Sequence, residues 1–189
     1  RMKSNDHRQN WTVYLCQDKH LDYNWCGTNT EIEIRMAKLL DYYLDQSERH
    51  GSKWNLDSTL WFDVYRRHRG DEGVTRLAAA IRDGCFGYGA NHSVQLWGMM
   101  STDTAIRALL GVREIEKRSG TTARTALLME SWGLQHGVAS ILTDSGITRL
   151  ARGTYPLRAE EYHKSRAPHP LFYWTAPNGK KLLVYWPQY

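Results

Sequence analysis

Short β-rich segments alternate with longer segments of helical periodicity along this 189-residue chain. The β-rich segments mix β-branched, aromatic and apolar residues, as strands do, and they are residues 11–17, 53–59, 85–91, 124–130 and 147–151. Between them, apolar residues recur every three or four positions, which is typical of helices packed on one side. This order predicts parallel βαβ units in one layered or barrel-shaped α/β domain.

Two of the predicted helices carry start signals. Thr30, followed three residues later by Glu33, matches a capping box, and the apolar spacing extends that helix to about residue 49. Ser101 or Thr102 predicts the start of a single later helix. One side of that later helix is formed by Ile106, Leu109, Leu110 and Arg113.

The C-terminal segment 171–186 differs, because Asn178-Gly179 separates two β-rich runs. This dipeptide is the strongest short-range signal for a β-hairpin. No second domain can be separated within residues 1–189. A closed (β/α) barrel usually needs about 250 residues, and this chain ends inside an apolar, strand-like run. We therefore expect it to be one part of a longer barrel domain.

Charge and composition exclude several classes of partner. The net charge of +5 is spread along the chain, and its dense basic cluster is RRHR at residues 66–69. Nucleic-acid-binding proteins gather such charge beside aromatic residues, so we expect a solvated helix end here and no nucleic-acid partner. Cys16, Cys26 and Cys85 are expected as buried free thiols. No apolar stretch approaches the roughly 18 residues of a membrane span, so we expect no membrane partner, and the localisation stays unknown.

Residue types that bind metals follow the first predicted strand. His20 and Asp22 are spaced so that both side chains can project the same way from a strand end. Parallel α/β domains carry their sites at the carboxyl ends of strands, and zinc accepts nitrogen and oxygen ligands. The pair therefore predicts a metal site. Trp25 follows it, either as an apolar wall of the site or as ordinary core.

Three blocks carry a family resemblance. Residues 18–25, DKHLDYNW, resemble the His-x-His-x-Asp-x-x-Trp opening of the glycoside hydrolase family 38 α-mannosidases, although Asp18 stands at the first His. Residues 127–147 resemble the Asp-Pro-Phe-Gly-His-Ser segment of that family, and residues 172–189 resemble its Phe-x-Trp-x-x-Pro-Asp-Gly hairpin. The resemblance covers about residues 11–189.

The resemblance implies a fold and a site. The fold would be the N-terminal part of a seven-stranded (β/α)7 barrel, with the rest of the barrel and C-terminal β domains supplied elsewhere in a longer protein. His20 and Asp22 would bind Zn²⁺, and Trp25 would line the subsite of a carbohydrate substrate. A fourth metal ligand, a distant His, would lie beyond Tyr189.

The catalytic carboxylates match the family pattern less well. Family members carry an aspartate nucleophile shortly after the strand that matches residues 85–91, and the alignment places it near Gln95 or Leu96, neither of which can attack a sugar. Asp103 and Glu130 are the carboxylates that could act instead, and Glu130 stands where the family has Asp-Pro-Phe-Gly. Asp103 also suits the first turn of a helix.

Three further residues are candidate sugar contacts. Asn91 ends the predicted strand at residues 85–91 and His92 follows it, and both would point into the site of a divergent family member. Tyr155 lies near a family position that contacts sugar, and it also suits a core or rim position. The eight Trp and eleven Tyr residues of the chain supply flat faces that serve sugars as well as cores.

The sequence thus predicts a zinc-dependent, α-mannosidase-like glycoside hydrolase. Two alternatives stay open at this point. One is a carbohydrate-binding protein that has lost catalysis, because the expected nucleophile is missing. The other is a metal-dependent hydrolase of a sugar ester or amide, in which the same His and Asp pair activates water.

Overall fold

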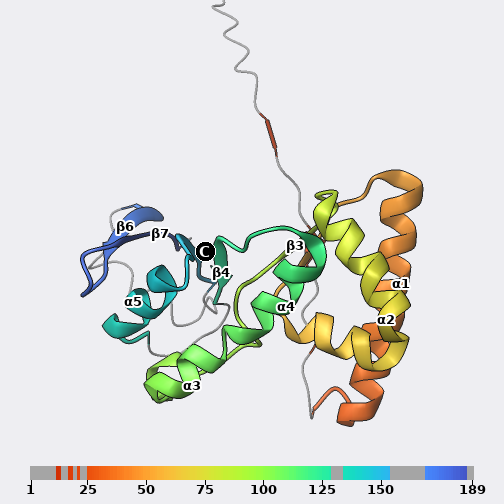
Figure 1. Ribbon diagram of the computed structural model, residues 1–189, viewed down its shortest axis with the longest axis horizontal. Coiled ribbons are helices and arrows are strands. Elements are labelled where there is room, and N and C mark those ends of the chain that lie inside the picture. The colour runs from red at the N-terminus through yellow and green to blue at the C-terminus, as the bar shows by residue number, and fades with distance from the viewer. Residues whose placement is uncertain are drawn as a thin grey trace, which may run out of the picture.

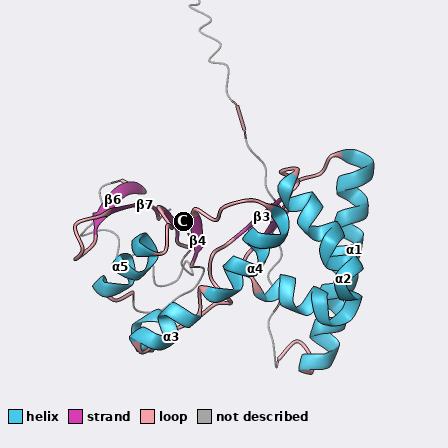
Figure 2. Cartoon of the chain, viewed as in Figure 1, coloured by secondary structure: helices cyan, strands magenta, loops and turns pink. Residues whose placement is uncertain are grey.

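The computed structural model describes residues 12–13, 17–18, 21, 25–128, 134–153 and 169–186 (Figure 1). The helices are α1 (Asn29–His50), α2 (Leu60–Arg82), α3 (Thr102–Arg107), α4 (Leu110–Ser119) and α5 (His136–Asp144), and a 3-10 turn (Trp97–Met99) precedes α3. The strands are β1 (Gln17–Asp18), β2 (Trp54–Leu56), β3 (Phe86–Tyr88), β4 (Thr125–Leu127), β5 (Arg149–Ala151), β6 (Leu171–Thr175) and β7 (Lys181–Tyr185). Strands and helices alternate through most of the chain, as predicted (Figure 2).

Hydrogen bonds arrange the strands in two sheets. The first has the order β1-β2-β3 and is parallel throughout. The second has the order β4-β5-β7-β6, in which β6 alone is antiparallel to its neighbour. Both the parallel βαβ arrangement and the C-terminal hairpin are therefore confirmed. Among the described residues the strands do not form a complete (β/α)7 barrel, and only the mixed α/β fold is established.

The two sheets meet where β3 ends and β4 begins. The Ala90 N–H donates to the Thr125 carbonyl at 3.0 Å. One residue later, the side-chain oxygen of Asn91 accepts a hydrogen bond from the Leu127 N–H, also at 3.0 Å. These two hydrogen bonds therefore make β4 the neighbour of β3, so that the second sheet continues the first.

Helices cover one face of the two sheets. Trp54 and Leu56 of β2 pack into a core with α1 and α2, and Ala126 of β4 packs into a second core with α3, α4 and α5. Because strand residues alternate in direction, the intervening residues face the other way and are more exposed. We call this second side the open face, and it carries Asn55, Gly87, Leu127, Ala151 and Tyr185.

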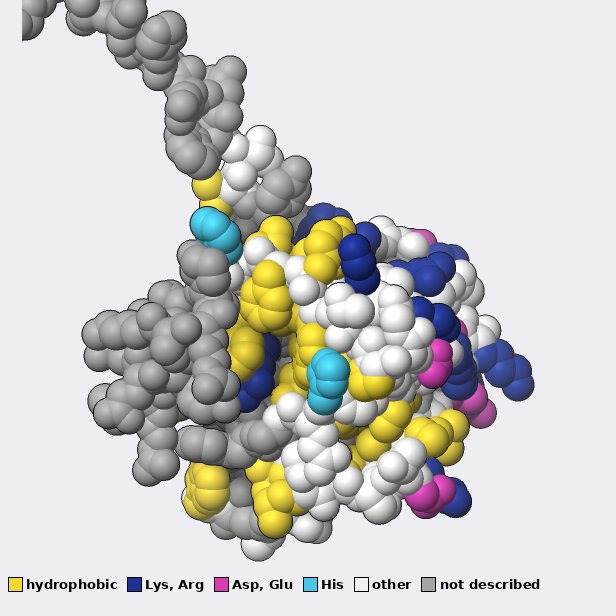
Figure 3. All heavy atoms as spheres, turned by 90° about the vertical axis from the view of Figure 1, so that its left-hand side faces the viewer, with side chains coloured by type: hydrophobic (Ala, Val, Ile, Leu, Met, Phe, Trp, Pro, Cys, Tyr) yellow, Lys and Arg dark blue, Asp and Glu magenta, His cyan; other side chains and the backbone are white. Residues whose placement is uncertain are grey.

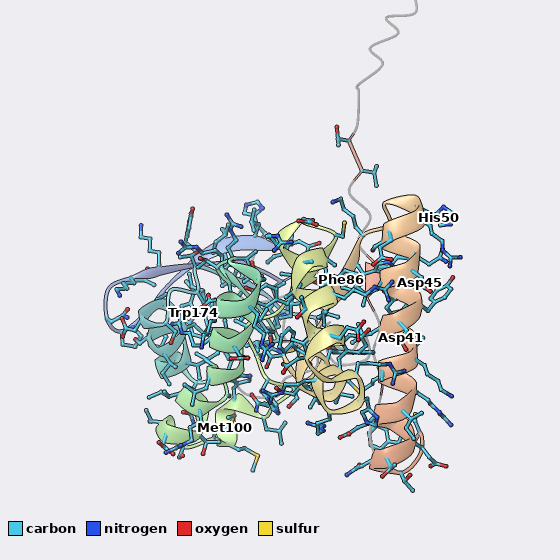
Figure 4. All side chains as sticks on the ribbon, turned by 45° about the vertical axis from the view of Figure 1, so that its right-hand side comes forward. Asp41, Asp45, His50, Phe86, Met100 and Trp174 are labelled. Carbon is cyan, nitrogen blue, oxygen red and sulfur yellow. The ribbon has the colours of Figure 1, made fainter. Side chains whose placement is uncertain are left out.

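The basic cluster at residues 66–69 lies at a helix end as predicted, because Gly70 breaks α2 directly after it and Arg66, Arg67 and Arg69 are exposed. The Arg69 guanidinium binds Asp41 on α1 with an N–O distance of 2.5 Å, and the Tyr65 hydroxyl donates to the same carboxylate at 2.8 Å. Arg67 binds Glu33 at 2.6 Å. These side chains bind α2 to α1, on which Figure 4 labels Asp41. The sequence did not predict these ion pairs with α1, because the acidic partners lie about thirty positions earlier in the chain.

Two predicted helix features are wrong in detail. The capping box of α1 is formed by Thr28 and Glu31, so the helix begins earlier than the predicted cap at Thr30. The Glu31 carboxylate accepts from the Thr28 N–H at 2.9 Å, which fixes that start. Ser101 caps α3 as predicted, but the predicted single helix is divided into α3 and α4 at residues 108–109.

Cysteine burial and membrane topology were also predicted. Cys26 is exposed and Cys85 is half-buried, so the prediction of buried thiols is wrong for Cys26. Cys16 lies outside the described residues.

Within the described parts of the chain, no helix combines the length and the apolar character needed to cross a membrane.

Candidate functional site

The residues that follow β2 and β3 form one edge of the first sheet. Parallel strands end at the same edge, and this is where α/β folds place their sites. Asp57 directly follows β2, and residues 89–92 follow β3. Backbone hydrogen bonds join the two segments, because the Thr59 N–H donates to the Asn91 carbonyl at 2.8 Å and the Leu60 N–H donates to the His92 carbonyl at 2.9 Å.

Asn91, a predicted sugar contact, is buried in this edge with 1% of its surface exposed. Its amide nitrogen donates to the Asp57 carbonyl at 3.1 Å and to the Ser93 carbonyl at 3.4 Å. Its amide oxygen accepts from the Leu127 N–H. The side chain therefore binds three stretches of backbone together, and its contact with sugar stays a prediction.

His92 lies beside the first turn of α2. Its Nδ1 atom is 3.9 Å from a carboxylate oxygen of Asp63, which also receives the Arg66 guanidinium at 3.3 Å. The His92 side chain is 41% exposed, so a ligand at this edge can reach the imidazole. This location is compatible with the predicted sugar contact.

Asp57 is a polar residue of this edge that the sequence reasoning did not single out. The indole N–H of Trp61, a core residue on α2, donates to a carboxylate oxygen of Asp57 at 2.8 Å. The aspartate is half-buried at the carboxyl end of β2. The sequence did not set it apart, because Asp57 lies inside the predicted strand at residues 53–59, whereas the observed strand β2 ends at Leu56.

Trp25 and Asp103 both lie at the surface, apart from the Asp57–Asn91 edge in sequence. Trp25 is 81% exposed in the turn before α1 and belongs to neither of the two hydrophobic cores. Asp103 lies in the first turn of α3, where its carboxylate binds Arg107 at 2.8 Å and its side chain is 72% exposed. Asp103 therefore occupies the first-turn position that suits an acidic residue in any helix.

Four predicted site residues lie outside the described residues: His20, Asp22, Glu130 and Tyr155. Among the residues that the structure does describe, no group of three or more His, Cys, Asp or Glu side chains could hold a metal ion. The predicted metal pair is thus neither placed nor tested by the described geometry.

The fold and this edge define a class of protein. Parallel strands covered by helices on one face, with polar side chains after the strand ends, are typical of α/β enzymes whose sites lie at the carboxyl edge. The chain belongs to the glycosyl hydrolases family 38 N-terminal domain, whose family model matches residues 10–189. This match confirms the family resemblance.

Solved structures agree with this fold. An alpha-mannosidase from Enterococcus faecalis V583 superposes with a TM-score of 0.67 at 18% identity, covering 83% of this chain and 18% of that one. A glycosyl hydrolase family 38 protein from Enterococcus faecalis has a TM-score of 0.67 at 17% identity, covering 90% of this chain and 18% of that one. A 4-alpha-glucanotransferase from Thermococcus litoralis has a TM-score of 0.58 at 12% identity, covering 92% of this chain and 27% of that one.

The comparisons also set limits. The chain spans 18% of the length of the two Enterococcus faecalis proteins. At these identities the superpositions establish the fold alone. No curated protein matches the chain significantly.

Proposed function

We propose that this chain forms part of the catalytic domain of a zinc-dependent glycoside hydrolase that cleaves α-mannosides. The observation that carries the proposal is the family match over residues 10–189. The polar edge after β2 and β3 supports it, because it lies where such a domain would bind its substrate. The likeness to an alpha-mannosidase fold favours mannosides among the possible sugars.

The chemistry of the available donors fits zinc. An imidazole nitrogen from His20 and a carboxylate oxygen from Asp22 are both ligand types that zinc accepts. Both residues follow β1 in sequence, and β1 pairs with β2, so that Asp18 lies opposite Asn55. When bound, the ion would polarise hydroxyl groups of the sugar.

We assign the essential carboxylate to Glu130 rather than to Asp103. A retaining glycosidase uses two carboxyl groups about 5 Å apart, one as nucleophile and one as acid/base. Glu130 follows β4 in sequence by three residues, and such domains carry their catalytic residues after the carboxyl ends of strands. Asp103 instead binds Arg107 on the exposed side of α3. Trp25 and Tyr155 would then supply flat faces against the sugar ring.

The test is metal analysis and hydrolysis of 4-nitrophenyl α-D-mannoside by the full-length protein. We expect bound zinc and turnover, and we expect the His20→Ala/Asp22→Ala double variant and a chelator to remove both. Glu130→Gln should keep the metal and lose at least about 100-fold in kcat. Asp83→Asn is the matched control, because Asp83 is exposed beside Arg82 at the far end of α2.

The outcomes separate the competing functions. Turnover that survives chelation and the double variant would refute the metal role. Mannoside binding without turnover would favour the carbohydrate-binding protein. Acetate release from acetylated glycans, without mannoside cleavage, would favour the hydrolase of another bond.

A further inference from the structure

Asp57 is held at the carboxyl end of β2 from two sides. On the α2 side, the Trp61 indole donates to its carboxylate, and Trp61 itself is 4% exposed in the core. On the β3 side, the Asn91 amide donates to its carbonyl oxygen. A core side chain therefore fixes the carboxylate while a buried amide fixes the backbone that carries it.

Gly89, which directly follows β3, packs closely against the Asp57 backbone and the Asn91 side chain. A Cβ atom on Gly89 would lie 2.7 Å from the Asp57 carbonyl oxygen and 2.9 Å from the Asn91 side-chain oxygen. Real Cβ atoms do not approach so closely, so only glycine fits at position 89 without a shift of backbone. Support of this kind, in which surrounding residues lock the position of a polar group, is what a binding residue needs to be effective.

The strand register relates Asp57 to the predicted metal pair. Asp18 of β1 lies opposite Asn55 of β2. In sequence, Asp57 follows Asn55 by two residues, as His20 follows Asp18 by two. Asp57 thus comes in sequence directly after the end of β2, as His20 comes shortly after β1, and the carboxyl ends of parallel strands are where α/β folds place their sites.

We propose that Asp57 is a substrate-binding residue, whose carboxylate accepts a hydrogen bond from a hydroxyl group of the sugar bound at this edge. The inference rests on the proposed glycosidase function and adds a specific contact to it. Carboxylates bind sugar hydroxyls through charge-assisted hydrogen bonds, which are about twice as strong as neutral ones. A rigid carboxylate also needs no reordering when the sugar arrives.

A purely structural role makes different demands on the same residue. Asp57 lies just before α2, and a negative charge there stabilises the N-terminus of the helix. This electrostatic effect does not require one particular position of the carboxylate. Asp57→Glu keeps that charge and moves the carboxylate by one methylene. Asp57→Asn keeps the shape and an oxygen that can accept from Trp61, and it removes the charge.

The experiment measures both variants in the full-length protein, with Asp83→Asn as control. We expect Asp57→Asn to raise the KM for 4-nitrophenyl α-D-mannoside, and the Kd for methyl α-D-mannoside, by about 10- to 100-fold. Asp57→Glu should weaken binding as well, because the acceptor is displaced. The melting temperature and zinc content should match those of the control.

Each other outcome overturns the inference or supports it. Unchanged KM and Kd in Asp57→Asn, beside an active wild type, overturn the sugar contact and leave the proposed function standing. A lower melting temperature in Asp57→Asn that Asp57→Glu restores, with binding unchanged, assigns a helix role instead. Loss of zinc makes Asp57 a metal ligand and overturns the sugar contact. A wild type that binds methyl α-D-mannoside without turnover, and loses binding in Asp57→Asn, supports the contact while refuting hydrolysis. A wild type that neither binds nor hydrolyses mannosides overturns both.

Discussion

Replacing Asn91 by alanine should destabilise the protein far more than its small volume suggests. The substitution removes the acceptor of the Leu127 N–H and the donor to the Asp57 carbonyl. Leaving a buried donor unpaired costs about 1–3 kcal/mol, and losing a second ordinary hydrogen bond costs about 0.5–1.5 kcal/mol. The free energy of unfolding should therefore fall by about 2–4 kcal/mol, a large part of the roughly 5–15 kcal/mol that holds a typical domain together.

The assay is thermal and urea unfolding of the wild type, Asn91→Ala and a control, Asn55→Ala. In a domain of this size, 1 kcal/mol shifts the melting temperature by about 2–4 °C, so Asn91→Ala should lower it by roughly 5–15 °C. Asn55 is a half-buried asparagine of the same sheet, and its side chain makes no hydrogen bond within the described region. Its loss should cost under about 1 kcal/mol.

Hydrogen exchange provides a local check on the same reasoning. The Leu127 amide should lose protection in Asn91→Ala, whereas amides inside α1 should keep it, because α1 does not depend on the sheet junction. Equal stability of Asn91→Ala and Asn55→Ala, or a Leu127 amide protected as in the wild type, would refute the bridging role.

Three further predictions concern backbone fit and charge. Gly89→Ala should lower the melting temperature as strongly as Asn91→Ala, because the new Cβ atom would lie 2.7 Å from the Asp57 carbonyl oxygen. A variant as stable as the wild type would show that the residues after β2 and β3 are loosely packed. Gly70 interrupts α2 with φ 63° and ψ −162°, a conformation restricted to glycine. Gly70→Ala should therefore lower the free energy of unfolding, measured in urea, by about 1–3 kcal/mol. An unchanged free energy of unfolding would mean that the backbone at the kink relaxes. Burial raises the pKa of Asp41, but hydrogen bonds from Arg69 and Tyr65 outweigh this and lower it below its usual value. Because the folded pKa is depressed, this stabilisation is present above the unfolded value near 4 and is lost as the pH falls through the folded pKa. The wild type should therefore lose more stability between pH 6 and pH 3 than Arg69→Met, and parallel curves would contradict the ion pair.

Features that depend on neighbouring residues were predictable from the sequence. The apolar spacing predicted the helix α1 as packed on one side, and its buried residues include Ile32, Met36 and Leu40. Asn178 identified the hairpin, and in the turn its side-chain oxygen accepts a hydrogen bond from the Lys180 N–H at 3.0 Å. Such signals survive because both partners of the interaction lie in one short stretch, or because the residue type itself permits the turn.

Features that depend on distant residues were not predictable. The basic residues of α2 are paired with α1 because the two helices lie side by side, which a count of charges cannot show. Asn91 was predicted as the last residue of a strand, whereas β3 ends at Tyr88, and its bond to Leu127 spans 36 positions. Asp57 was missed for the same reason, since its significance depends on the neighbouring strands.

The exposed hairpin shows how far local pattern alone can mislead. Leu171, Tyr173 and Tyr185 look like core residues by type, yet each is at least half exposed on the open face. Figure 3 views the molecule from the side on which β6 and β7 lie in Figure 1, and apolar side chains are visible at that surface. The alternation of side chains along β6 determines which residues are buried. Phe172 and Trp174 pack against the second core, so Leu171 and Tyr173 face the other way.

The two hydrophobic cores have a consequence for how the protein is made. The buried residues of the first core lie between Ile32 and Ile115, and those of the second between Ala90 and Val184. A ribosome releases the N-terminal part first, and compact units fold as they emerge. The first core can thus close while β4 and everything after it are still being translated. The nascent sheet then presents the end of β3, with Asn91 already in place, as the template onto which β4 adds.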